Sequence, residues 1–191
     1  MNQVIVLSGP TGAGKTAVAE ALCERFDRML HVEVDELRHW VKAGYRHPWA
    51  GDHQAQEQLE LAVRNACAIA RESVAMRYAV VITGVALPHQ AALYRTLLAP
   101  LQAQGQAHAA SHFVTLLPSL DVTLQRDAER RSSFPERVHA LHREFTDAVV
   151  EGTLPGLVLD TSTDANPAAT ADRVQDAVAR GLAVLLHGHW A

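Results

Sequence analysis

One stretch near the start of the chain combines residue types that can bind a polyphosphate. It lies between an apolar run, Val4 to Leu7, and a helical pattern that begins at Ala17. Its eight residues are Gly9, Pro10, Thr11, Gly12, Ala13, Gly14, Lys15 and Thr16. Glycines let backbone N–H groups close round phosphates, the following helix points its positive end inward, and lysine and threonine add a cation and a hydroxyl. The pattern predicts a phosphate-binding loop (P-loop).

Each position of this loop has an expected role. Lys15 is expected to reach the β- and γ-phosphates of a nucleotide, and the Thr16 hydroxyl is expected to ligate Mg²⁺. An ordinary glycine-rich turn is the alternative, but the flanking strand and helix make coincidence rarer. Five further residues are expected to bind the nucleotide: Gly9, Thr11, Gly12, Ala13 and Gly14.

Asp35 follows the second predicted strand, residues 30–34. It falls at the carboxyl edge of the sheet, where open α/β folds bind ligands, so it can orient or deprotonate an acceptor hydroxyl or hold Mg²⁺ through water. The alternative is that Asp35 serves only as the cap of the helix predicted for residues 36–41. Arg38 follows one helical turn later and suits a polar substrate. Glu33, on the same strand face, is a further metal candidate or a partner for an exposed cation.

Three arginines precede a break between two helical patterns. Arg126, Arg130 and Arg131 come just before Ser132-Ser133-Phe134-Pro135. A helix, loop and helix of this kind can close as a lid, around residues 126–137, and place positive charge on a transferring phosphoryl group. A solvated, charged helix surface is the other interpretation.

The segment 42–53 is rich in aromatic residues and histidines, although only 5% of the chain is aromatic. Tyr45, Trp49 and His53 predict an aromatic, partly apolar pocket for the substrate. Packing of this long loop on its own domain explains the same composition equally well.

The third predicted strand, residues 79–83, ends in Thr83-Gly84 without a carboxylate. Many P-loop ATPases and GTPases keep a metal-binding acid there, so its absence argues against a motor-type ATPase. No Asn-Lys-x-Asp tetrapeptide is present, which argues against a guanine-specific switch. The metal is left to Thr16, water and an acid from the second strand.

The whole chain has the composition of a globular protein. Its 191 residues, 48% hydrophobic and 20% charged, predict one domain spanning 1–191. A net charge of −4 favours a small-molecule substrate over nucleic acid. No apolar run reaches the roughly 20 residues that span a membrane, and no signal peptide precedes the first strand, so a cytoplasmic location is expected.

Five apolar strand patterns alternate with helical patterns along the chain. This alternation predicts a three-layer α/β/α fold with a five-stranded parallel sheet and a small helical lid. The ligand cleft is expected at the carboxyl ends of the strands, beside the P-loop. The predicted strands cover residues 4–7, 30–34, 79–83, 113–117 and 157–159.

The chain resembles the small P-loop kinases of the nucleoside-monophosphate-kinase superfamily. It is similar to the small-molecule branch that includes chloramphenicol phosphotransferase, gluconate kinase, shikimate kinase and the zeta-toxin-like kinases. The residues that carry the resemblance are 9–16, Val34-Asp35-Glu36-Leu37-Arg38 and Arg126-x-x-x-Arg130. The segment 44–53 matches no substrate motif of these enzymes.

The resemblance implies an ATP- and Mg²⁺-dependent kinase that phosphorylates a hydroxyl of a small molecule, as a monomer or homodimer. It implies Asp35 as the base, Arg126 near the adenine, Arg130 and Arg131 on the phosphates, and residues 160–162 beside the base of the nucleotide. The P-loop also resembles that of adenylate and tRNA isopentenyltransferases, which bind a prenyl diphosphate. A nucleotide-binding regulatory module without turnover is a third possibility.

Overall fold

The computed structural model describes residues 3–103, 110–129 and 134–185. Within these ranges, five strands form one parallel sheet in the order β2-β3-β1-β4-β5. The fold class predicted from the sequence is therefore confirmed. The strands are β1 (Gln3–Ser8), β2 (Met29–Glu33), β3 (Ala79–Thr83), β4 (Ala110–Leu116) and β5 (Leu157–Leu159).

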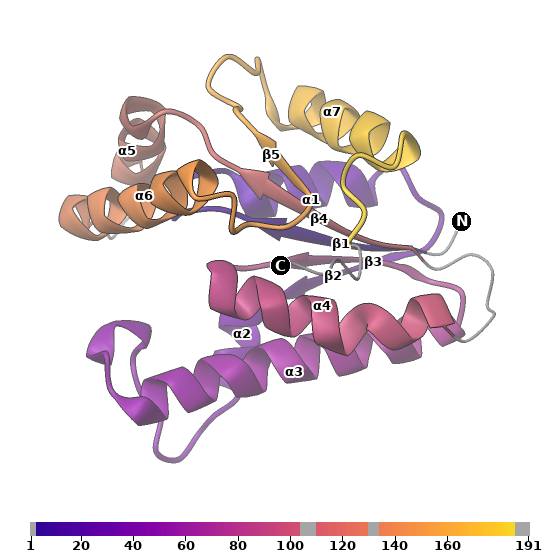
Figure 1. Cartoon of the computed structure of the whole chain (residues 1–191), viewed down its shortest axis with the longest axis horizontal. Coiled ribbons are helices and arrows are strands. Elements are labelled where there is room, and N and C mark those ends of the chain that lie inside the picture. The colour runs from indigo at the N-terminus through magenta and orange to yellow at the C-terminus, as the bar shows by residue number, and fades with distance from the viewer. Residues whose placement is uncertain (1–2, 104–109, 130–133, 186–191) are drawn as a thin grey trace.

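Helices cover both faces of the sheet. In Figure 1, α1 and α7 lie on one side, α3 and α4 lie on the other, and α5 and α6 lie together at one end. The helices are α1 (Lys15–Cys23), α2 (Val34–His39), α3 (His53–Ala75), α4 (Pro88–Ala103), α5 (Leu120–Ala128), α6 (Pro135–Val150) and α7 (Pro167–Ala179), and a 3₁₀ turn, η1, spans Pro48–Ala50. The helix, loop and helix predicted around residue 132 correspond to α5 and α6, with residues 130–133 outside the described ranges.

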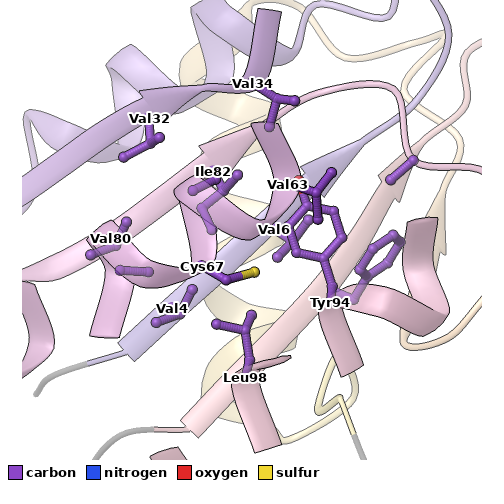
Figure 2. Close-up of a cluster of buried hydrophobic side chains, with 14 of the residues drawn as sticks. Val4, Val6, Val32, Val34, Val63, Cys67, Val80, Ile82, Tyr94 and Leu98 are labelled. Atoms are coloured by element: carbon purple, nitrogen blue, oxygen red, sulfur yellow. The ribbon is translucent and has the colours of Figure 1, made fainter. Parts of the chain in front are cut away.

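The central strands are apolar because both of their faces are covered. Val4 and Val6 of β1 and Ile82 of β3 pack toward α3 and α4, where they meet Tyr94 and Leu98, as Figure 2 shows. On the opposite face, other residues of the same strands pack against α1 and α7. A continuous apolar run is the pattern expected of a parallel strand buried on both sides. This packing fixes the carboxyl end of β1, from which the P-loop begins.

The start of α2 differs from the sequence prediction. The helix begins at Val34, so Asp35 lies in its first turn and not at the end of the strand. Val34 and Leu37 are both buried in the core on the α3 side of the sheet. Because burial of these two side chains favours a helix from Val34 onward, Asp35 is placed on the exposed face of that helix.

One buried histidine makes stability depend on pH. His112 of β4 is buried beside Ile5, and its Nδ1 atom has no hydrogen-bond partner in the described part of the chain. Burial lowers the pKa of His112. The native state therefore binds fewer protons than the unfolded state, whose histidine titrates near pH 6.5, so stability is fully present above that pH and falls as the pH drops through it.

We expect the free energy of unfolding to be lower at pH 5.5 than at pH 7.5, and His112→Gln to reduce this difference. Urea denaturation of both proteins at the two pH values measures it. His53→Gln is the matched control, since the side chain of His53 is 83% exposed. Equal pH differences in the wild type and His112→Gln would contradict the prediction.

Candidate active site

The P-loop leaves the amino end of α1 open to an anion. Gly14 is the N-cap of α1, with φ +88°, and no side chain caps the helix. By contrast, Asp52 caps α3, Ser119 caps α5 and Asn166 caps α7. The first N–H groups of a helix need acceptors, and the helix dipole favours a negative one. The end of α1 therefore has the geometry of a phosphate site.

Glycine is required at two places where the P-loop touches other elements. A Cβ atom on Gly9 would lie 2.2 Å from the carbonyl oxygen of Leu116, at the end of β4. A Cβ atom on Gly12 would lie 2.5 Å from the carbonyl oxygen of Thr123 in α5. Both glycines also have positive φ values, +144° and +87°. Because side chains cannot fit, the loop backbone approaches β4 and α5 closely.

Lys15 lies over the loop that precedes it. Its Nζ atom donates hydrogen bonds to the carbonyl oxygens of Gly9 and Pro10, both at 2.9 Å. These contacts hold the ammonium group across the loop. Phosphate oxygens are stronger acceptors for an ammonium than carbonyls are, so a bound phosphate would take over these hydrogen bonds.

Arg126 connects the P-loop to the segment that follows β5. Its Nη1 atom lies 3.7 Å from the position of a Cβ on Gly14, and its Nη2 atom donates to the carbonyl oxygen of Thr161 at 3.5 Å. Ser162, next in the chain, accepts from the backbone N–H of Ser119 at 2.8 Å. The residues expected beside the nucleotide base, 160–162, are thus brought next to Arg126. Arg130 and Arg131 lie outside the described residues.

Glu33 stands beside the threonine of the P-loop. Thr16 Oγ1 donates to Glu33 Oε1 at 2.8 Å. In the sheet register Glu33 of β2 pairs with Thr83 of β3, the position that lacks an acid. A neighbouring strand therefore supplies the carboxylate that β3 does not. His31 packs between them, 2.9 Å from Thr83 Oγ1 and 3.8 Å from Glu33 Oε1, and burial lowers its pKa.

A magnesium ion fits this pair of oxygens. Mg²⁺ prefers hydroxyl and carboxylate oxygens and keeps several waters or phosphate oxygens as its other ligands. Within the described ranges no group of three or more His, Cys, Asp or Glu side chains is placed to hold a metal ion. Thr16 and Glu33 can therefore hold Mg²⁺ only together with a phosphate or water.

Asp35 lines the same small pocket as the P-loop side chains. This pocket, of about 120 Å³, is bounded by three P-loop residues, the two carboxylates and the end of β3: Thr11, Lys15, Thr16, Glu33, Asp35, Thr83, Gly84 and Val85. The Asp35 carboxylate is exposed toward it. The tertiary structure thus brings a possible base next to the expected phosphate site.

Arg38 is buried beneath Asp35. It is 3% exposed, its Nη2 atom donates to the carbonyl oxygen of Arg46 at 3.4 Å, and its Nε atom has no partner in the described part of the chain. Burial lowers the pKa of Arg38, and the nearby charge of Asp35 raises it. A buried guanidinium with an unused N–H group can still donate a hydrogen bond to an anionic or carbonyl oxygen.

The three aromatic and histidine residues predicted to bind substrate are not brought together. Tyr45 packs on His39, with ring centroids 5.6 Å apart. His53 lines a separate groove between α3 and α4. Trp49 of η1 lies across from the start of α6, where the Arg137 guanidinium carbon is 5.1 Å from the centre of its ring. Of the three, Trp49 shares a pocket with a P-loop residue, Thr11.

The loop before α3 is attached to that helix by side-chain hydrogen bonds. Gln58 accepts a hydrogen bond from the backbone N–H of Arg46 and donates one to the carbonyl oxygen of Gly44, both at 2.8 Å. Arg46 makes a further contact with α3, because its Nε atom donates a hydrogen bond to Oε1 of Gln54. These contacts hold the loop against the first turns of α3.

Sequence reasoning missed Arg137. Its guanidinium lies 4.5 Å from the centre of the Phe134 ring as well as over Trp49. The signal available in the sequence was its place two residues after Pro135, in the first turn of the helix that follows the lid. Nothing in that position distinguishes it from a solvated arginine without the tertiary contact to Trp49.

In the presence of ATP, Mg²⁺ is expected to raise the unfolding temperature. We expect Glu33→Gln to raise by about tenfold the Mg²⁺ concentration that gives half of this increase, because loss of a charged oxygen near a metal costs about 10–100-fold in affinity. Thermal unfolding with saturating ATP and increasing MgCl₂ measures it. Glu36→Gln, one of the exposed carboxylates of α2, is the matched control. Identical Mg²⁺ curves for Glu33→Gln and the wild type would show that Glu33 does not serve the metal.

The fold and the site together define a P-loop nucleotide-binding protein. The sequence matches the AAA domain family over residues 4–151. The chain therefore belongs to the AAA domain family. The comparison with curated proteins found no match.

Several solved structures share the fold from end to end. The tunicamycin resistance protein of Deinococcus radiodurans is 22% identical, with a TM-score of 0.60, and the match covers 96% of this chain and 98% of that one. Shikimate kinase from Acinetobacter baumannii, in complex with shikimate, is 20% identical, with a TM-score of 0.60 and coverage of 95% and 94%. APS kinase of Mycobacterium tuberculosis, in complex with AMPPNP and APS, is 16% identical, with a TM-score of 0.61 and coverage of 93% and 98%. The predicted resemblance to small P-loop kinases is confirmed for the fold.

None of the helices in the described ranges has the length and apolarity needed to cross a membrane.

Proposed function

We propose that the chain is an ATP- and Mg²⁺-dependent phosphotransferase that moves the γ-phosphoryl group to a hydroxyl of a small molecule. One observation carries the proposal: Asp35, a carboxylate able to accept a proton, lines the same pocket as Lys15 and Thr16 of the P-loop. Phosphoryl transfer needs held phosphates, positive charge on the transferring oxygens and an oriented nucleophile. This pocket offers a group for each need.

The reaction is a transfer between two oxygen atoms. The acceptor hydroxyl oxygen forms a bond to the γ-phosphorus, the bond from that phosphorus to the β–γ bridging oxygen breaks, and ADP leaves. Asp35 takes the hydroxyl proton as the new bond forms. Lys15 and the α1 backbone hold the phosphates, and Arg126, with Arg130 and Arg131 from the lid, neutralises the charge that develops.

Mg²⁺ would supply positive charge that neutralises the phosphates of ATP. Thr16 would ligate it, and the contact from Thr16 to Glu33 at 2.8 Å supports Glu33 as a partner. Asp35 can serve the metal through water in place of acting as base. Substitution of Asp35 distinguishes the two roles. Loss of a metal ligand changes the Mg²⁺ requirement, whereas loss of a base lowers kcat.

The acceptor is a small molecule of a kind that the P-loop does not determine. Asp35 and Arg38 are proposed to bind its polar part, and Trp49, which shares a pocket with Thr11 of the P-loop, its remaining surface. Tyr45 and His53, grouped with Trp49 from the sequence, lie elsewhere in the structure. The AMPPNP, APS and shikimate named with two of the similar structures support a nucleotide donor and a small acceptor. The third similar structure, a tunicamycin resistance protein, adds antibiotics to the acceptors worth testing.

Transfer from γ-labelled ATP to sugars, nucleosides, nucleotides and antibiotics tests the proposal. We expect one labelled product together with an equal amount of ADP. ATP binding without transfer to any of them would favour a regulatory module without turnover. Thermal protection with Mg²⁺ by dimethylallyl diphosphate, and not by ATP, would favour an isopentenyltransferase.

A further inference from the structure

A second pocket lies on the other side of Thr11. It has a volume of about 250 Å³ and is lined by residues of the P-loop, η1, α5 and the start of α6, among them Thr11, His47, Trp49, Asp127, Phe134 and Arg137. Thr11 also lines the pocket that contains Lys15 and Asp35. The two pockets therefore share Thr11 of the P-loop as a lining residue.

Two large aromatic side chains are exposed at this pocket. Trp49 is 43% exposed and Phe134 is 52% exposed. They come from segments far apart in the chain. Arg137 lies over both rings, 5.1 Å from the centre of Trp49 and 4.5 Å from the centre of Phe134. We call Trp49, Phe134 and Arg137 the aromatic cluster. Exposed aromatic surface lining a concave site is typical of ligand pockets.

The backbone on both sides of the aromatic cluster is held in place. The His47 side chain accepts a hydrogen bond from the backbone N–H of Trp49 at 3.4 Å. The Asp127 carboxylate accepts one from the backbone N–H of Phe134 at 3.3 Å. These two hydrogen bonds restrain the backbone at Trp49 and Phe134, and such restraint lowers the entropy cost of binding.

The cluster offers planar surfaces and one positive charge. Among the described residues no carboxylate lies within 4.0 Å of the Arg137 guanidinium nitrogens, and the guanidinium lies over two aromatic rings. A flat guanidinium and two aromatic rings bind best to another flat, electron-rich ring, through stacking and cation–π attraction. A polyol offers no such face.

We propose that this pocket binds the acceptor and that the acceptor is a hydroxylated molecule carrying a planar aromatic or heteroaromatic ring. The ring stacks on the aromatic cluster, and the hydroxyl reaches across Thr11 toward Asp35. This assignment rests on the proposed phosphotransferase function. The pocket volume is below the about 300–1,000 Å³ typical of sites for drug-sized ligands, which favours a nucleoside-sized molecule over a larger one.

Fluorescence of Trp49 tests binding without relying on turnover. The chain has three tryptophans, so Trp40→Phe with Trp190→Phe leaves Trp49 as the reporter. The probes are matched pairs that differ in the ring, uridine with ribose and phenyl β-glucoside with methyl β-glucoside, each added to the AMPPNP and Mg²⁺ complex. We expect a saturable change with at least one ring-bearing probe and none with its partner. No change with either ring-bearing probe, or equal changes within both pairs, would overturn the proposal.

Steady-state kinetics distinguish an effect on acceptor binding from an effect on phosphoryl transfer. For a ring-bearing acceptor, Trp49→Leu is expected to raise the acceptor KM by about tenfold, with kcat and the KM for ATP changed less than about twofold, because a lost stacking contact weakens binding alone. Trp49→Phe retains a ring and should restore the acceptor KM. Trp40→Leu is the control, since Trp40 is exposed at the end of α2 and does not line the pocket.

The outcomes distinguish this inference from the function on which it rests. An unchanged acceptor KM in Trp49→Leu, with transfer intact, overturns the ring pocket and leaves the phosphotransferase. Saturable binding of a ring-bearing probe without phosphoryl transfer to any acceptor supports the pocket and overturns the phosphotransferase.

Discussion

Asp35→Asn is expected to lower kcat by about a thousandfold while leaving the affinity for ATP within about twofold of the wild type. Asparagine keeps the shape and polarity of the side chain and loses its capacity to take a proton, and a positioned base contributes about 10²–10⁴-fold to a rate. Because Asp35 lies in the first turn of α2, across the pocket from Lys15, its loss should not disturb the P-loop. Steady-state transfer and ATP titration by calorimetry measure the two effects.

Glu36→Gln supplies the control for Asp35→Asn. It removes the neighbouring exposed carboxylate of the same helical turn and leaves Asp35 in place. We expect kcat to remain near that of the wild type. An Asp35→Asn protein with full turnover would exclude Asp35 as the base, and one with normal kcat only at high Mg²⁺ would assign Asp35 to the metal.

Lys15→Met is expected to lower kcat by about a hundredfold to a thousandfold and to weaken ATP binding, because a preorganised cation at the transferring phosphate supplies about that much rate. The Lys15 ammonium is 2.9 Å from each of two carbonyl oxygens of its own loop, and these contacts hold it over the loop. Equilibrium binding of ATP and steady-state transfer measure the effect.

The sequence provides a charge-matched control for Lys15→Met. Its two lysines are Lys15 and Lys42. Lys42→Met removes the same charge from the loop that follows α2, at a residue that does not line the P-loop pocket, and should leave ATP binding unchanged. Equal losses in the two variants would mean that net charge, and not position, controls ATP binding.

Local sequence patterns were sufficient to predict the sheet and the phosphate loop. A strand buried on both faces must be apolar throughout, so the run at Val80, Val81 and Ile82 predicts β3 with the bounds that the structure shows. The P-loop pattern is equally local, because all of its residues lie within eight consecutive positions. The close approach of Gly9 to Leu116 and of Gly12 to Thr123 is set by the tertiary structure. The argument from Thr83-Gly84 against a motor-type ATPase stays a prediction, although the structure does place Glu33 beside that position.

The arrangement around the substrate was harder to predict because long-range contacts decide it. The sequence grouped Tyr45, Trp49 and His53 as one pocket on the basis of composition, whereas the structure directs them to three different places. Gln58 sets the path of that loop through two hydrogen bonds to its backbone, and no local pattern reveals this.

The sequence by itself determined the succession of strands and helices along the chain and the phosphate loop with Lys15 and Thr16. It also determined the two carboxylates at the end of the second strand, Glu33 and Asp35. These follow from hydrophobic periodicity and from spacing within a few residues. Only the tertiary structure decided that Glu33 meets Thr16, since parallel pairing of β2 with β3 brings them together. Only it joined Trp49 to Arg137, because the contact crosses from the loop before α3 to the helix after the lid. Side chains so far apart in the chain become neighbours through packing of the core, which no single segment encodes.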